Sequence, residues 1–140
     1  MSRVIAGLVV SVLALVSVPA ALAGGGRPVL GWSHAFRSGK GFGVVQPRTV
    51  YLGGDPTGEV SKLRWQQWGS SKTSGFGQGW CPGQSVASGH YCTASLHLYD
   101  LASCHGRRAY SMMVFYFKPS PRRRWTVGAK LNVCTGQYLF

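Results

Sequence analysis

Short segments in which apolar and polar residues alternate dominate the chain after its first third. Residues 91–99 alternate cleanly: the even-numbered positions from 92 to 98 are apolar, and the odd-numbered positions carry tyrosine or polar side chains. A period of two is typical of an antiparallel strand with one covered face. Residues 109–117 are apolar on both faces, which predicts a central strand.

Further strand signals are separated by glycine, proline and serine at intervals of about ten residues. They are 49–52, 62–68, 73–80, 125–127 and 131–134, and the last two are expected to form a closing hairpin or meander joined near Gly128. No segment of the same region has the 3.6-residue period of an amphipathic helix. The pattern therefore predicts an all-β fold, a small antiparallel β-sandwich, with a small closed β-barrel as the alternative.

Three glycines alternate with larger residues in the segment 73–80. Gly75, Gly77 and Gly79 share one face of the predicted strand, and Phe76 and Trp80 share the other. A bare strip of backbone permits the close approach of another group. We favour a structural interpretation, in which aromatic side chains of neighbouring strands cover the glycines or the glycines let the sheet bend. The alternative is a ligand groove.

The chain begins with the pattern of a secretory signal peptide over residues 1–23. Arg3 precedes an uncharged apolar run from Val4 to Val18, Pro19 ends that run, and Ala21-Leu22-Ala23 supplies a small-x-small cleavage site. The apolar run is short for a membrane span, and no second run follows it. We therefore expect a protein that is secreted to the extracellular side, without integral membrane insertion.

The remainder is expected to hold one domain, because its length suits one hydrophobic core. Residues 24–46 are rich in glycine, serine and basic side chains, which predicts a flexible N-terminal segment. Residues 47–140 carry the strand signals and are expected to form the single β domain.

Four cysteines, Cys81, Cys92, Cys104 and Cys134, are expected to form disulfides after export. Four cysteines allow three pairings, and the sequence alone does not choose between them. We favour a Cys81–Cys92 bond, which would close a local hairpin, with a Cys104–Cys134 bond, which would tie the last strand to the domain. The rival interpretation, a metal site, lacks the C-x₂-C spacing of zinc ligands.

The charge of the chain is strongly unbalanced, with 15 Lys and Arg against 3 Asp and Glu and a formal net charge of +12. Such a protein attracts polyanions at long range. Basic side chains next to aromatic ones suit anionic glycans or single-stranded nucleic acid. The candidate ligand-binding residues are Arg107, Arg108, Arg122, Arg123, Arg124, Trp125 and Lys130. The alternative is a solvated loop with Trp125 in the core, where the charge serves only solubility.

Candidates for catalysis are few. Asp55 precedes a proline and Asp100 follows a predicted strand, and both are turn positions where Asp bonds nearby backbone. A secreted nuclease would need a histidine with a second His or Glu and a phosphate-binding cation. His97 and Arg107 are available, but nothing in the sequence fixes another histidine near His97. We therefore expect no catalytic residue, no metal and no cofactor.

Several motifs of the chain carry a resemblance to a group of known proteins. They are Tyr51-Leu52-Gly53-Gly54-Asp55-Pro56-Thr57-Gly58, Leu63-x-Trp65-x-x-Trp68-Gly69, Tyr99-Asp100-Leu101, Cys104-x-Gly106-Arg107-x-Ala109-Tyr110 and Leu131-x-x-Cys134-Thr135-Gly136. Over residues 47–138 the chain resembles a group of small secreted actinobacterial proteins, themselves uncharacterised. The resemblance implies a bond between Cys104 and Cys134, with Cys81 and Cys92 as an addition in this chain. It implies no activity.

The expected function is that of a secreted, non-enzymatic protein that associates with anionic envelope or extracellular polymers. Two alternatives stay open. One is a secreted inhibitor or effector that grips another protein through an exposed loop such as 82–89. The other is a small nuclease-like secreted hydrolase that uses His97.

Overall fold

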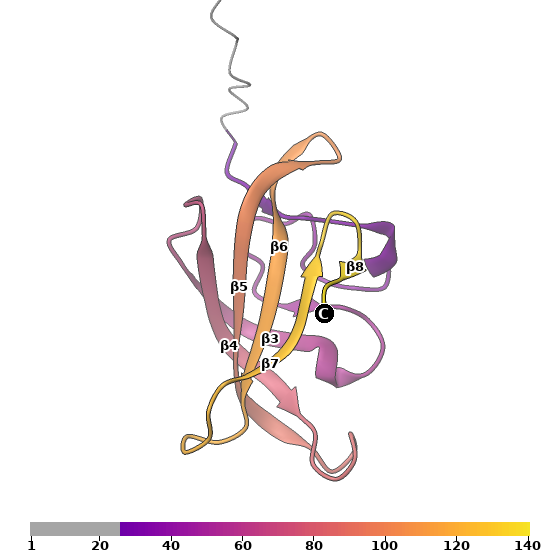
Figure 1. Cartoon of the computed structure of the whole chain (residues 1–140), viewed down its shortest axis with the longest axis vertical. Coiled ribbons are helices and arrows are strands. Elements are labelled where there is room, and N and C mark those ends of the chain that lie inside the picture. The colour runs from indigo at the N-terminus through magenta and orange to yellow at the C-terminus, as the bar shows by residue number, and fades with distance from the viewer. Residues whose placement is uncertain (1–25) are drawn as a thin grey trace, which may run out of the picture.

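The computed structural model describes residues 26–140, so the predicted signal peptide at 1–23 lies outside the described residues. The regular elements of the described chain are strands and short 3-10 helices, joined by turns and loops (Figure 1). In chain order they are β1 (Val29–Leu30), η1 (His34–Phe36), β2 (Val50–Tyr51), η2 (Pro56–Gly58), β3 (Glu59–Gln66), β4 (Thr73–Cys81), β5 (His90–Cys104), β6 (Arg107–Lys118), β7 (Thr126–Asn132) and β8 (Gln137–Tyr138).

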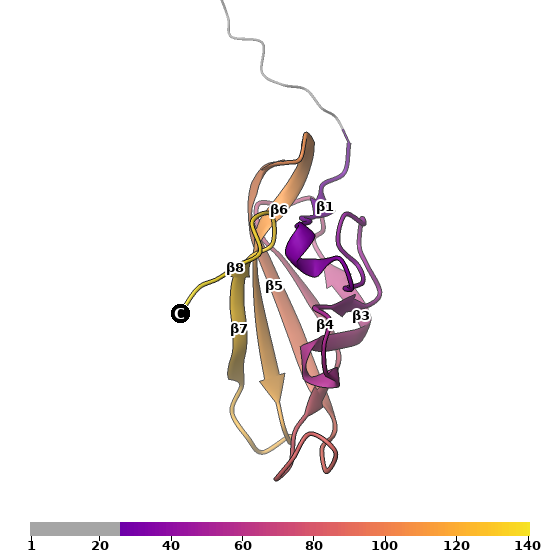
Figure 2. The same ribbon diagram turned by 90° about the vertical axis from the view of Figure 1, so that its right-hand side faces the viewer.

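All of these strands belong to one 8-stranded sheet with the order β2-β3-β4-β5-β6-β7-β8. Neighbours along this path are antiparallel, and β1 pairs in parallel with the start of β6. The sheet curls into half of a barrel, and the N-terminal part of the chain lies against one side of it (Figure 2). The predicted all-β, antiparallel, disulfide-linked fold is confirmed.

The core lies on the concave inner face of the curled sheet. The alternation predicted for residues 91–99 is present, because Ala94, Leu96 and Leu98 are almost fully buried there. Met113 and Phe115 meet them from β6, and Leu131 adds to the core from β7. Burial of these side chains is the main source of stability for the sheet.

The segment expected to be flexible packs onto the sheet instead. Leu30 is fully buried, Phe36 is 4 % exposed and stacks on Phe42, and β1 aligns Leu30 with Tyr110 of β6. The glycines of this segment serve close packing, since a Cβ at Gly39 would stand 2.5 Å from the backbone oxygen of Tyr51. The glycine-rich composition predicted a flexible linker, but burial of a few apolar side chains such as Leu30 and Phe36 fixes the segment on the sheet.

The glycine strip of β4 is covered by aromatic rings, which confirms the structural interpretation. A Cβ at Gly75 would stand 2.8 Å from the Trp65 ring of β3, and one at Gly79 would stand 2.5 Å from the Phe117 ring of β6. The glycines therefore let two large rings lie flat against the inner face of the sheet.

Residues 125–134 differ from the predicted hairpin. Strand β7 runs without a break from Thr126 to Asn132 and passes through Gly128. Gly128 is needed because a Cβ there would collide with the Phe117 ring, so this glycine marks a close approach and not a turn. The turn comes later, between Asn132 and Gln137, where the Asn132 side chain accepts hydrogen bonds from the backbone of Cys134 and Thr135.

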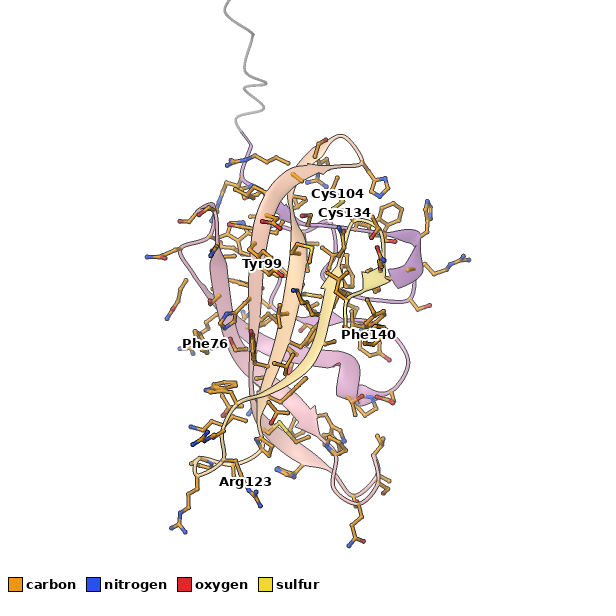
Figure 3. The ribbon with its side chains drawn as sticks, in the orientation of Figure 1. Phe76, Tyr99, Cys104, Arg123, Cys134 and Phe140 are labelled. Carbon is orange, nitrogen blue, oxygen red and sulfur yellow. A yellow bond between two sulfur atoms is a disulfide. The ribbon has the colours of Figure 1, made fainter. Side chains whose placement is uncertain are left out.

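Both favoured disulfides are present, Cys81–Cys92 and Cys104–Cys134. The first joins the end of β4 to the start of β5 and closes the loop 82–89. The second joins the end of β5 to the turn after β7, at the other end of the sheet (Figure 3). Within residues 26–140, no helix has the length and apolar character to span a bilayer.

Candidate ligand-binding face of the sheet

The outer face of the sheet, opposite the core, carries exposed rings and cations from β3 to β7. Strand pairing aligns Arg64, Phe76, Ser95, Tyr116 and Val127 in one row across five strands. Residues paired directly across an antiparallel ladder point to the same side, so these side chains are neighbours. Phe76 is 40 % exposed and Val127 is 59 % exposed, so this row is open to solvent at several points.

A second row lies next to the first, and it is shorter. Here Ser74, His97, Val114 and Lys130 are aligned across β4, β5, β6 and β7. The two rows are two residues apart along β4, β5 and β6, which corresponds to about 7 Å, and three residues apart on β7, where the register shifts. Aromatic, hydroxyl and cationic groups therefore lie within one side-chain length of each other on the outer face.

Two hollows open on this face. The first, here called the aromatic hollow, has a volume of about 430 Å³ and is lined by Phe76, Ser95, His97, Tyr116 and Trp125. The second, here called the lysine hollow, has a volume of about 460 Å³ and has Lys72 and Lys130 in its lining. The two hollows share His97 and Tyr116 in their lining, so they adjoin each other, and together they are here called the depression.

The floor of the aromatic hollow contains an unpaired polar group. Ser95 is 1 % exposed, and its hydroxyl has no hydrogen-bond partner among the described residues. Buried hydroxyl groups are normally paired, because an unpaired one loses its hydration without compensation. Phe76 and Tyr116 flank Ser95 in the strand register and shield it from water.

His97 separates the two hollows. Its ring centroid lies 4.7 Å from that of Tyr116, and the two rings are tilted by 54°. Partial burial lowers the pKa of His97 below its ordinary value, because removal from water disfavours the imidazolium form. The imidazole is therefore neutral near pH 7 and offers one donor and one acceptor nitrogen.

The candidate residues from the sequence fall into two groups in the structure. Trp125 is 42 % exposed and lines the aromatic hollow, and Lys130 lines the lysine hollow. Arg122, Arg123 and Arg124 are exposed in the loop that leads directly to Trp125. The backbone N–H of Arg123 donates to the Ser120 carbonyl and so tightens this loop into a turn. The alternative of Trp125 in the core is wrong.

Arg107 and Arg108 lie at the other end of β6. The length of that strand places them about 35 Å from the arginine loop. Figure 3 shows the separation, with Arg123 at one end of the molecule and the Cys104–Cys134 pair, next to Arg107, at the other. The Arg107 guanidinium donates to the Gly43 carbonyl at 3.1 Å, which fastens the N-terminal segment to the β5–β6 turn. The structure therefore does not bring all seven candidates together.

The candidates predicted from the sequence did not include Phe76, Ser95, Tyr116 or Lys72. Alternation along 91–99 places Ser95 on the face opposite the core, but it does not decide the face of Phe76 or of Tyr116. Their alignment depends on which residues pair across β4, β5 and β6, and such a register is not encoded in the period of any one strand.

The groups considered for catalysis lie apart in the structure. The Asp55 carboxylate caps η2 by accepting hydrogen bonds from the hydroxyl and backbone N–H of Thr57, and these bonds lower its pKa. His34 and His105 both contact the Trp32 ring, with centroids 4.7 and 5.2 Å away, while His97 contacts Tyr116. Among residues 26–140, no three His, Cys, Asp or Glu side chains are grouped as metal ligands.

The inner side of the half-barrel has a larger cavity of about 630 Å³ at its open end. Apolar groups such as Leu52, Trp80, Phe117 and Tyr138 line it, and Asp55 is its one charged lining residue. The Asp55 carboxylate is already bonded to Thr57, so this cavity offers little to fix the orientation of a charged ligand.

Comparison with known proteins returns no relative: no family model matches the sequence, no curated protein matches it, and no solved structure matches the fold. The site must therefore be interpreted from its own geometry.

Proposed function

We propose that this chain is an exported, non-enzymatic protein that binds anionic polymers through the outer face of its sheet. The observation that carries the proposal is the depression formed by the adjoining aromatic and lysine hollows, with the arginine loop Arg122–Arg124 beside it. The two disulfides of the protein are a type of cross-link that persists outside the reducing cytosol, and they therefore support export.

On the outer face of the sheet, the cationic side chains lie around the hollows. Lys72 and Lys130 border the depression, Arg64 stands beside Phe76, and none of the three acidic residues of the chain lines either hollow. A surface of one sign concentrates oppositely charged polymers and speeds their association. Exposed rings next to these cations add a contact area that pure solvation does not require.

Retention on heparin-agarose tests this surface. Replacing two charges with Arg122→Ser and Arg123→Ser is expected to lower the salt concentration at which the protein elutes, because fewer counterions are released on binding. The matched control removes two charges at the distant end of the sheet, with Arg107→Ser and Arg108→Ser, and is expected to elute close to the wild type. Equal shifts for the two variants would show that binding follows net charge alone and would refute the proposed surface.

A further inference from the structure

We propose that the aromatic hollow holds one base of a single-stranded nucleic acid, with the Ser95 hydroxyl as a partner for the edge of that base. This inference rests on the proposed function and specifies the polymer. It starts from two independent observations, a hollow whose lining includes four rings and a buried hydroxyl in that lining that has no partner among the described residues.

The walls suit a flat ring. Phe76 comes from β4, His97 from β5, Tyr116 from β6, and Trp125 from the loop before β7, so each wall has a separate backbone support. Phe76 and Trp125 are about two-fifths exposed, which leaves ring surface available for stacking. Base–aromatic stacking of this kind contributes to single-strand binding with little dependence on sequence.

The mostly apolar lining surface of the hollow favours a base over a sugar ring. Among the described residues, its polar side-chain groups are the Ser95 hydroxyl, the His97 nitrogens, the Tyr116 hydroxyl and the Trp125 N–H. A sugar ring carries hydroxyl groups around its rim, and several of them would be left without partners against these walls. A nucleobase has apolar faces and concentrates its polar atoms on one edge, which a single hydroxyl and an imidazole are able to serve.

Binding of a base would account for the unpaired, buried Ser95 hydroxyl. In the free protein it is buried at a cost, and cross-strand neighbours cover it. Exposed Phe76 and Trp125 are the side chains with room to move aside for an entering ring. A base edge would then supply the missing hydrogen bond, so an arrangement that is unfavourable in the free protein becomes favourable on binding.

The cationic side chains around the aromatic hollow would bind the phosphate groups that flank the base. Lys72 and Lys130 lie in the adjoining lysine hollow, within one strand row of the aromatic hollow. Arg64 lies on the opposite flank, paired with Phe76. A strand whose base enters the aromatic hollow therefore has cations on both sides for its backbone.

The test compares two oligonucleotides by fluorescence anisotropy at fixed salt. Labelled oligothymidine is expected to bind about tenfold more tightly than an abasic oligonucleotide of the same length and charge, because only the first has a ring to stack. Trp125→Ala is expected to remove most of this difference, because it weakens oligothymidine binding far more than abasic binding. Equal affinity for the two oligonucleotides in the wild type overturns the inference, while retention on heparin would still support the proposed function.

Ser95→Ala supplies a second readout that a purely structural role would not give. It is expected to raise the melting temperature of the free protein, since it removes an unpaired hydroxyl, and to weaken oligothymidine binding without affecting the abasic chain. A gain in stability with unchanged oligothymidine binding contradicts the role given to Ser95. If Trp125→Ala weakens heparin binding as strongly as oligothymidine binding, the hollow recognises a glycan and the nucleic-acid assignment is wrong.

Discussion

The two faces of the curled sheet differ, although their residues alternate along the same strands. The inner face is filled by side chains such as Leu96, Leu98 and Phe115, each at most 1 % exposed, and glycines on β4 and β7 admit the rings that complete it. The outer face keeps Phe76 and Trp125 open to solvent and leaves Ser95 without a partner among the described residues. The inner face is filled by buried side chains, whereas the outer face combines buried residues such as Val114 with exposed rings, as the proposed binding function would require.

The largest expected effect on the free energy of unfolding comes from comparing two adjacent residues of β5, one on each face. Leu96→Ala removes a fully buried side chain and is expected to lower the free energy of unfolding by about 3 kcal/mol, through lost burial and the cavity left behind. His97→Ala, one position along and on the outer face, is expected to change it by about 0.5 kcal/mol or less. Urea denaturation of both variants measures the difference, and similar losses would show that the outer face is also part of the packed core.

The glycines of β4 give a somewhat smaller effect. Gly79→Ala is expected to cost about 2 kcal/mol, because the added methyl group would stand 2.5 Å from the Phe117 ring and 2.9 Å from the Ala94 side chain. Gln78→Ala, its outer-face neighbour, is the control and is expected to be nearly neutral. Adding Phe117→Leu to Gly79→Ala should recover part of the loss in a double-mutant cycle, and strict additivity would contradict the ring contact.

Much of the fold follows from the sequence, because alternation is a local signal. The period of two in residues 91–99 assigns Leu96 and Leu98 to the core without knowledge of any partner strand. Glycine is harder to interpret, since it favours a turn and a close approach for different reasons. Gly128 therefore suggested a hairpin, while the structure places it inside β7 under the Phe117 ring.

The candidate site was only partly predictable. Local charge and aromatic content identified Trp125 and the arginine loop next to it. They also suggested Arg107 and Arg108, although the strand predicted at 109–117, observed as β6, separates the two basic clusters by its whole length. Phe76, Ser95 and Tyr116 become neighbours only through the register of three strands, and such long-range pairing requires the folded chain.

Ser95 lies on the outer face but is buried, and its substitution is expected to stabilise the protein, whereas Leu96→Ala and Gly79→Ala destabilise it. Ser95→Ala should raise the free energy of unfolding by up to about 1 kcal/mol, because a buried hydroxyl without a partner loses its hydration on folding. Thr93→Ala, at the exposed outer-face position before it, is the matched control and should be close to neutral. A clear loss of stability for Ser95→Ala would mean that the hydroxyl has a partner, such as an internal water.

The smallest expected effect is a pH dependence that arises on the outer face alone. Folding lowers the pKa of His97 by burial, so over the pH range below its ordinary value of about 6.5 the unfolded chain binds more protons at this site than the folded protein. The free energy of unfolding should therefore fall as the pH drops through this range, and the contribution should vanish above it. His97→Gln is expected to flatten this part of the profile in urea titrations at pH 7 and pH 5, while Leu96→Ala should lower the whole curve and leave its slope unchanged. An unaltered slope in His97→Gln would show that the imidazole is as well hydrated in the folded protein as in the unfolded chain.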